Sequence, residues 1–119
     1  MIQIDDVRSL QTRIGEEIAV SDWFEISQQR IDQFAAATGD SQWIHVDPVR
    51  AAAELPSKRT IAHGFLTLSL LSTLMREAIR FTGLRMAINY GVNRVRFIEP
   101  VGALPFWDLL RQKAALLPE

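Results

Sequence analysis

The stretch that decides the fold of this chain is Phe34–Pro48, which reads FAAATGDSQWIHVDP. Its first half completes an apolar helix, and Gly39 predicts the end of that helix because glycine readily adopts the left-handed cap. Asp40 follows directly and lies five positions before His45. Asp47-Pro48 then predicts another short helix, with the aspartate as N-cap and the proline in the first turn. We therefore expect the acid and the histidine on an irregular segment between two helices.

A second segment, Ile61–Phe65, reads IAHGF and predicts the start of a long, mostly apolar helix that reaches about Phe81. The N–H of Gly64 has no acceptor within such a helix because it belongs to the first turn. A carboxylate, an imidazole that titrates near neutral pH and a free amide donor are the groups needed to add water next to a carbonyl. One such donor is worth roughly 3 kcal/mol to a developing oxyanion.

Each of these residues also has a plainer interpretation. Asp40 can be a turn acid that accepts bonds from nearby amides, and His45 can be a satisfied core histidine. Gly64 can serve only tight packing, and we interpret His63 as a first-turn residue without a catalytic role. Two histidines and scattered carboxylates lack metal-ligand spacing, so we expect no metal site.

Flanking patterns complete the predicted elements. Ser27 is typical of an N-cap for a helix that carries Ile31, Phe34, Ala35 and Thr38 on one face. The other expected elements are a short helix over 4–14, a strand over 17–26, a strand over 85–98 and an amphipathic helix over 105–117, in which Phe106 and Trp107 help to cover the long helix. In the second strand, alternation places Arg94 and Arg96 on one face.

Composition narrows the function further. Thirteen basic residues against fourteen acidic ones give no field that would attract nucleic acid or an anionic membrane. The absence of cysteine excludes disulfides and thiolate metal sites. The N-terminal residues do not resemble a secretory signal, and no apolar run has the ~20 residues that span a bilayer. We expect one domain over residues 1–119, in a soluble cytoplasmic protein.

Three segments together, Phe34–Pro48, Ile61–Phe65 and Tyr90–Phe97 (YGVNRVRF), resemble the MaoC-like dehydratases, which include the (R)-specific enoyl-CoA hydratases. The resemblance covers about residues 15–102. It implies an α+β hot-dog fold, in which an antiparallel sheet wraps a long central helix, and a homodimer. The implied activity is hydration of trans-2-enoyl thioesters of coenzyme A or acyl carrier protein to (R)-3-hydroxyacyl thioesters, or the reverse dehydration. No separate cofactor is implied, since coenzyme A is part of the substrate.

The resemblance also implies roles for individual residues. Asp40 and His45 would be the catalytic pair, and Gly64 would be the backbone donor to the thioester oxygen. The residues expected to bind substrate are Gln42, Ser72, Asn93, Arg94 and Arg96. For Ser72 the alternative is a small residue packed against a sheet, and for the two arginines it is a solvated face.

The chain departs from the family in two places. Gln42 and Trp43 stand where the family often has asparagine and proline, and the strands that usually follow the Pro100–Gly102 turn give way to a helical pattern over 103–119. That tail predicts a truncation or a shifted reading frame. One alternative is therefore an inactive hot-dog module, and a weaker one is a hot-dog acyl-CoA thioesterase.

Overall fold

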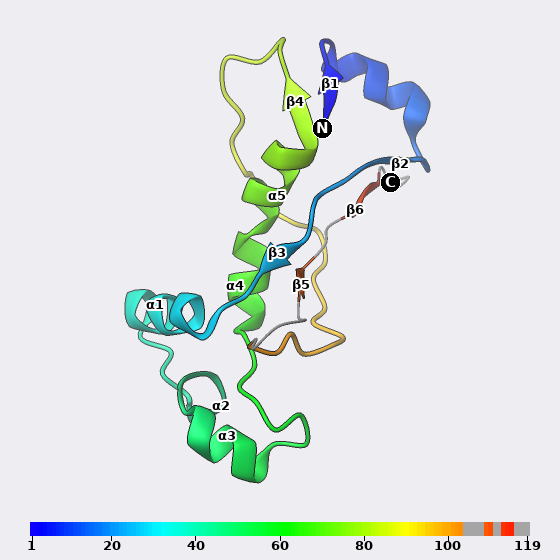
Figure 1. The fold of residues 1–119 in the computed structure, drawn as a ribbon. Helices are drawn as coiled ribbons and strands as arrows, with labels where there is room; N and C mark the ends of the chain where they lie inside the picture. Colours follow the sequence, from blue (N-terminus) through cyan, green and yellow to red (C-terminus); the bar gives the residue numbers. More distant parts are fainter. Residues whose placement is uncertain (104–108, 111–112, 116–119) are drawn as a thin grey trace. The chain divides into compact units, whose positions relative to one another are not determined.

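The computed structural model describes residues 1–103, 109–110 and 113–115. These residues form two compact units, which we describe separately. The first unit contains Met1–Asp22 and Leu71–Arg96 together with strand β6 (Lys113–Ala115). The second contains Trp23–Leu70 and the chain from Phe97 to strand β5. Figure 1 labels the helices and strands of both units.

The first unit is built from two strand pairs. Its elements are β1 (Ile2–Ile4), the 3₁₀ helix η1 (Val7–Arg13), β2 (Glu17–Val20), α5 (Leu71–Ala78), β4 (Ile79–Phe81) and β6 (Lys113–Ala115). Strand β1 pairs in parallel with β4, and β2 pairs antiparallel with β6. The core of this unit is a cluster of four buried side chains, Ile4, Ile18, Ala78 and Ile79.

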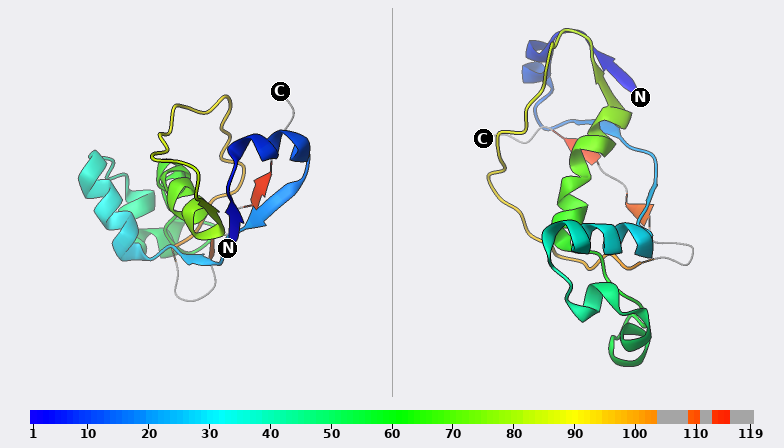
Figure 2. Two further views of the ribbon diagram at one scale, coloured as in Figure 1. Left: turned by 90° about the horizontal axis from the view of Figure 1, so that it is seen from above. Right: turned by 90° about the vertical axis from the view of Figure 1, so that its left-hand side faces the viewer.

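The second unit carries most of the helical structure. Its elements are β3 (Phe24–Glu25), α1 (Gln28–Thr38), α2 (Trp43–Val46), α3 (Pro48–Glu54), α4 (Gly64–Ser69) and β5 (Leu109–Leu110). Strand β3 pairs antiparallel with β5. Helix α2 contacts both α1 and α3. Figure 2 shows the chain from two further sides. Ile26 and Ile31 are fully buried in this unit.

The helix ends predicted from local signals are confirmed. The Ser27 hydroxyl accepts a hydrogen bond from the N–H of Arg30, and the Asp47 carboxylate caps α3 in the same way. Gly39 has a φ of 79°, and its N–H donates to the carbonyl of Ala35 at 2.8 Å. This left-handed conformation is accessible to glycine at little cost and ends α1 where the sequence indicates.

Other predicted elements are corrected. The helix over 4–14 is confirmed only as η1, because Ile4 forms part of β1. The helix from His63 to Phe81 is two helices, α4 and α5, with Leu70 between them in right-handed helical conformation, and its last three residues form β4. The strand over 17–26 is β2 and β3 with a break after Val20.

Two predictions near the C-terminus are wrong for the residues that the structure describes. Residues 85–98 form no strand, although their apolar residues alternate. Tyr90 is fully exposed, and no described strand pairs with this segment. Within 105–117, the described residues are β5 and β6, whose backbones pair with β3 and β2 instead of forming helical turns. The expected packing of Phe106 and Trp107 lies outside the described residues.

Candidate active site

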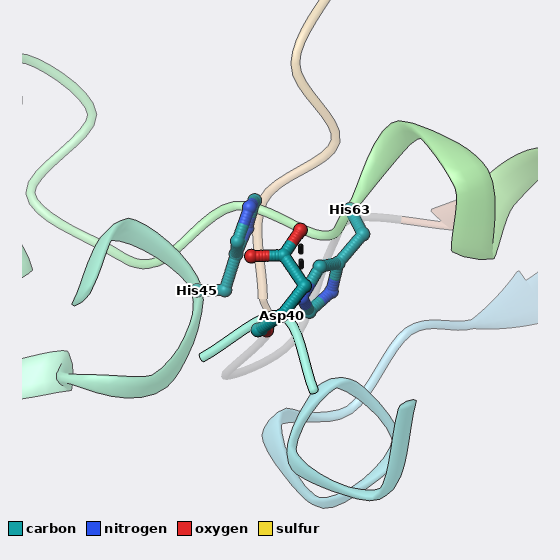
Figure 3. Close-up of side chains that lie close together, drawn as sticks. All are labelled: Asp40, His45 and His63. Carbon is teal, nitrogen blue, oxygen red and sulfur yellow. Dashed lines mark hydrogen bonds and ion pairs between the residues drawn. The ribbon is translucent and has the colours of Figure 1, made fainter. Parts of the chain in front are cut away.

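Asp40 and His45 lie close together in the second unit. The carboxylate belongs to the irregular segment after Gly39, as predicted. The imidazole was expected on the same irregular segment, but it belongs to the short helix α2. Ligand-type atoms of Asp40, His45 and His63 all lie within 4.8 Å of one another. Figure 3 shows the Asp40 carboxylate directed toward the two imidazole rings. The side chain of Asp40 is 56% exposed, whereas His45 is buried, so the pair joins a solvated acid to a shielded base.

The orientation of His45 is fixed by its main-chain surroundings. Its Nδ1 lies 2.6 Å from the carbonyl oxygen of Ile61, and the N–H of Ile61 donates to the carbonyl of Ile44. A carbonyl can only accept, so Nδ1 carries the proton in the neutral ring and Nε2 is left as the basic nitrogen. This tautomer suits a residue that takes a proton from water.

Gln28 holds the helix that carries His45. Its amide group donates to the carbonyl of His45 at 2.8 Å and accepts from the hydroxyl of Thr60, which is almost completely buried. Sequence reasoning missed both residues. No sequence signal marks either one, because Gln28 lies 17 positions from His45 and 32 positions from Thr60.

His63 is part of the same cluster, contrary to our interpretation of it as a mere first-turn residue. It is the N-cap residue of α4, and only 3% of its surface is exposed. Its Nε2 lies 2.8 Å from the backbone carbonyl oxygen of Asp40, and its ring stacks on His45 with centroids 3.8 Å apart. The dashed line in Figure 3 joins His63 and Asp40.

Gly64 and His45 line one cavity of about 290 Å³, which is also lined by Phe97–Val101. Gly64 is the first residue of α4, so its N–H lies at the positive end of that helix and has no intrahelical acceptor. The ring of Phe97 packs against this glycine: a Cβ at position 64 would lie only 2.7 Å from it. The predicted base and the predicted amide donor thus line the same cavity.

By ligand type and distance, these three side chains form a group that could hold a metal ion. From the sequence we expected no such group, because the histidines and carboxylates are scattered along it. Their geometry does not suit an ion. The planes of the two imidazoles are inclined by only 23°, and metal ions bind in the plane of the ring, about 2.0–2.1 Å from the nitrogen. Stacked rings therefore cannot direct both lone pairs at a common point. In addition, one nitrogen of each ring already faces a backbone carbonyl.

The residues expected to bind substrate are divided between the two units. Gln42 lies beside the pair, as the exposed N-cap residue of α2. Ser72, Asn93, Arg94 and Arg96 belong to the first unit, where the Ser72 hydroxyl accepts a bond from the Asn89 amide at 2.7 Å. Asn93, Arg94 and Arg96 are exposed on the irregular segment, so the shared strand face predicted for the arginines does not form. Their roles toward substrate stay predictions.

Comparison with known proteins places this site in a family. The sequence model of the MaoC like domain matches residues 9–103. The chain therefore belongs to the MaoC-like family, and its fold is of the α+β hot-dog class. The described helices include none long and apolar enough to cross a membrane.

Two relatives align with most of the chain. It is 50% identical over 101 residues to 3-hydroxyacyl-thioester dehydratase Z of Mycobacterium tuberculosis (strain ATCC 25618 / H37Rv), covering 85% of this chain and 66% of that protein. It is 52% identical over 101 residues to Nodulation protein N of Rhizobium meliloti (strain 1021), covering 84% and 61%. The chain thus spans less than two thirds of the length of these relatives.

Proposed function

We propose that this chain adds water to trans-2-enoyl thioesters to give (R)-3-hydroxyacyl thioesters, or catalyses the reverse dehydration. The acyl group would be carried by coenzyme A or an acyl carrier protein. One observation carries the proposal: the Asp40 carboxylate lies next to His45, and His45 shares a cavity with the helix-terminal Gly64. The name of the relative 3-hydroxyacyl-thioester dehydratase Z supports the same chemistry.

The groups at the site suit the atoms of this reaction. The basic Nε2 of His45 and the carboxylate of Asp40 hold the attacking water between them. As the water oxygen bonds to C3, one proton passes to the pair and the electrons of the C2–C3 double bond move toward the thioester oxygen. The N–H of Gly64 stabilises the negative charge on that oxygen. A proton from the pair then reaches C2, so that one water is added and the pair returns to its starting state.

The test is a steady-state assay with crotonyl-CoA, following the loss of enoyl-thioester absorbance, with chiral analysis of the 3-hydroxyacyl product. We expect Asp40→Asn and His45→Gln each to lower kcat by about 10²–10⁴-fold, the range that general acid–base groups contribute. Asp47→Asn is the matched control, because Asp47 is a nearby acid whose carboxylate caps α3 instead of facing the imidazoles. Its kcat should stay close to that of the unmodified chain.

Several outcomes would contradict the proposal. An active Asp40→Asn/His45→Gln double variant would show that the pair does not carry the reaction. An (S)-product would refute the stereochemical part alone. Release of free thiol without formation of a hydroxyacyl product would indicate a thioesterase.

We also propose that the chain acts as a homodimer. Support comes from the segment 84–95 of the first unit, where large apolar side chains are exposed, among them Met86 (72%), Ile88 (76%) and Val92 (60%). Contiguous exposed apolar surface is unusual on a monomer and typical of an interaction site. Light scattering after size-exclusion chromatography should give twice the mass of one chain, and Ile88→Glu should shift it toward the monomer. A monodisperse, active monomer would contradict this.

A further inference from the structure

We propose that His63 is a positioning residue, which holds the Asp40 segment against His45 and keeps the two reacting side chains close together. The inference rests on the proposed function for its kinetic consequence, but its structural part can be tested without any activity. His63 is only 3% exposed, its Nε2 faces the Asp40 carbonyl and its Nδ1 is buried, so we assign it no contact with substrate.

The first step concerns what holds Asp40 in place. Its backbone N–H lies at 3.4 Å from the Thr38 hydroxyl, near the limit of a hydrogen bond. Its carbonyl accepts the 2.8 Å bond from His63, and its carboxylate stays 4.0 Å from the same Nε2. Among the described residues, His63 is therefore the strongest anchor of an otherwise exposed acid. Loss of this bond would free the segment after Gly39 to move away from His45.

The second step concerns the tautomer of His63. A hydrogen bond to a backbone carbonyl requires the proton on Nε2, which leaves Nδ1 without a proton in the neutral ring. Nδ1 is buried and has no hydrogen-bond partner among the residues that the structure describes. The opposite neutral tautomer would place a donor where no described acceptor lies and would break the bond to Asp40. The surroundings thus select one tautomer for His63, with the proton on the opposite nitrogen from that of His45.

The third step concerns packing. The His63 ring lies against His45 on a nearly parallel plane and against Phe34 at a centroid distance of 4.9 Å and an angle of 52°. A ring packed in this way has little rotational freedom, so it transmits the position of α4 to both Asp40 and His45. Sub-ångström placement matters here, because a displacement of about 1 Å can cost about 10²-fold in rate.

The kinetic test compares two variants. His63→Leu removes the donor, and we expect kcat to fall about 10²-fold with KM changed by no more than about threefold. His63→Gln keeps an N–H donor at a similar reach, and we expect it to recover at least tenfold of that loss. Equal kcat values for both variants, or an unchanged kcat in His63→Leu, would overturn the positioning role. A loss expressed mainly in KM would overturn it too, since that pattern indicates a substrate contact.

The structural test uses long-range ¹H–¹⁵N NMR of the unmodified chain, which distinguishes protonated from bare imidazole nitrogens. We expect the Nε2–H form for His63 and the Nδ1–H form for His45 at a pH where both rings are neutral. An Nδ1–H form for His63 would overturn the inference even if the enzyme is active. If NMR shows the expected tautomers but the chain does not hydrate crotonyl-CoA, the role of His63 in holding Asp40 is supported. The proposed function is then refuted instead.

Discussion

Gly64→Ala tests whether the Phe97 ring packs on the start of α4 as the structure shows. The added Cβ would lie 2.7 Å from two atoms of that ring. Because carbon atoms in good contact are about 3.5–4.0 Å apart, the ring or the helix end must move by about 1 Å. Overpacking of this kind costs about 1–3 kcal/mol. Replacing glycine by alanine in a helix also gains about 0.4–1 kcal/mol from the unfolded chain.

The net loss in the free energy of unfolding should therefore be about 1–2 kcal/mol, or about 4–8 °C in Tm for a chain of this size. Urea denaturation at fixed pH measures it. Gly91→Ala is the matched control, because a Cβ there meets nothing within 4 Å and its φ lies outside the positive range. That variant should differ from the unmodified chain by less than about 0.5 kcal/mol.

A double-mutant cycle with Phe97→Ala identifies the cause. If the ring is the obstacle, Gly64→Ala should cost at least about 1 kcal/mol less in the Phe97→Ala background, since the clash is then removed. Phe97 is 52% exposed, so the truncation itself should leave the chain folded. Additive effects, within about 0.3–0.5 kcal/mol, would refute the packing of Phe97 on Gly64.

Three further predictions address other parts of the molecule. Gln28→Ala should lower the free energy of unfolding by about 1–3 kcal/mol in urea titrations, because it leaves the buried Thr60 hydroxyl and the His45 carbonyl without their partner. The control Gln33→Ala, on the exposed side of α1, should leave the free energy of unfolding unchanged. Hydrogen bonds from Thr82 and, to a smaller extent, from Gln3 lower the pKa of Asp5. Thr82→Val should therefore raise that pKa in an NMR titration, and Thr82→Ser, which keeps the hydroxyl, should not. A lowered folded pKa gives stability that is fully present above the unfolded value of about 3.9 and is lost as the pH falls through the folded pKa. The stability difference between Thr82→Val and the unmodified chain should therefore be present at neutral pH and vanish in acid. Chelation with EDTA should change neither Tm nor kcat, and a fall in either would show that the Asp40–His63 cluster holds a metal after all.

The features that could be predicted from sequence depend on short-range signals. The caps at Ser27, Gly39 and Asp47 each involve a residue within four positions along the chain, so the pattern contains the whole interaction. The proximity of Asp40 and His45 was predictable for the same reason, because a glycine-ended helix and a proline-started helix leave only a short segment between them.

The features that could not be predicted depend on distant partners. Alternation over 85–98 predicts a strand, but a strand forms only where a neighbour accepts its hydrogen bonds, and the described part of the chain offers none there. Similarly, good helix formers at Leu109–Leu110 adopt a strand because β3 pairs with them. His63 was undervalued because its contacts reach back to Asp40, 23 positions away, and no local signal marks them.

Two parts of the chain form the site, and substitutions in each part should affect different kinetic constants. The hydrogen bonds that place the acid and the two imidazoles all run between residues of 28–63, from Gln28 to His45, from His45 to Ile61 and from His63 to Asp40. The rest of the cavity lining comes from Phe97–Val101, which is joined to this region by the bond from the Ala62 N–H to the Val101 carbonyl. Proton transfer depends on the first set of contacts and the fit of the acyl group on the second. Substitutions such as Ile98→Ala should therefore change KM and the preferred acyl length while kcat for the best substrate is retained. Substitutions that remove one of the three placing bonds, at Gln28, His45 or His63, should act on kcat instead.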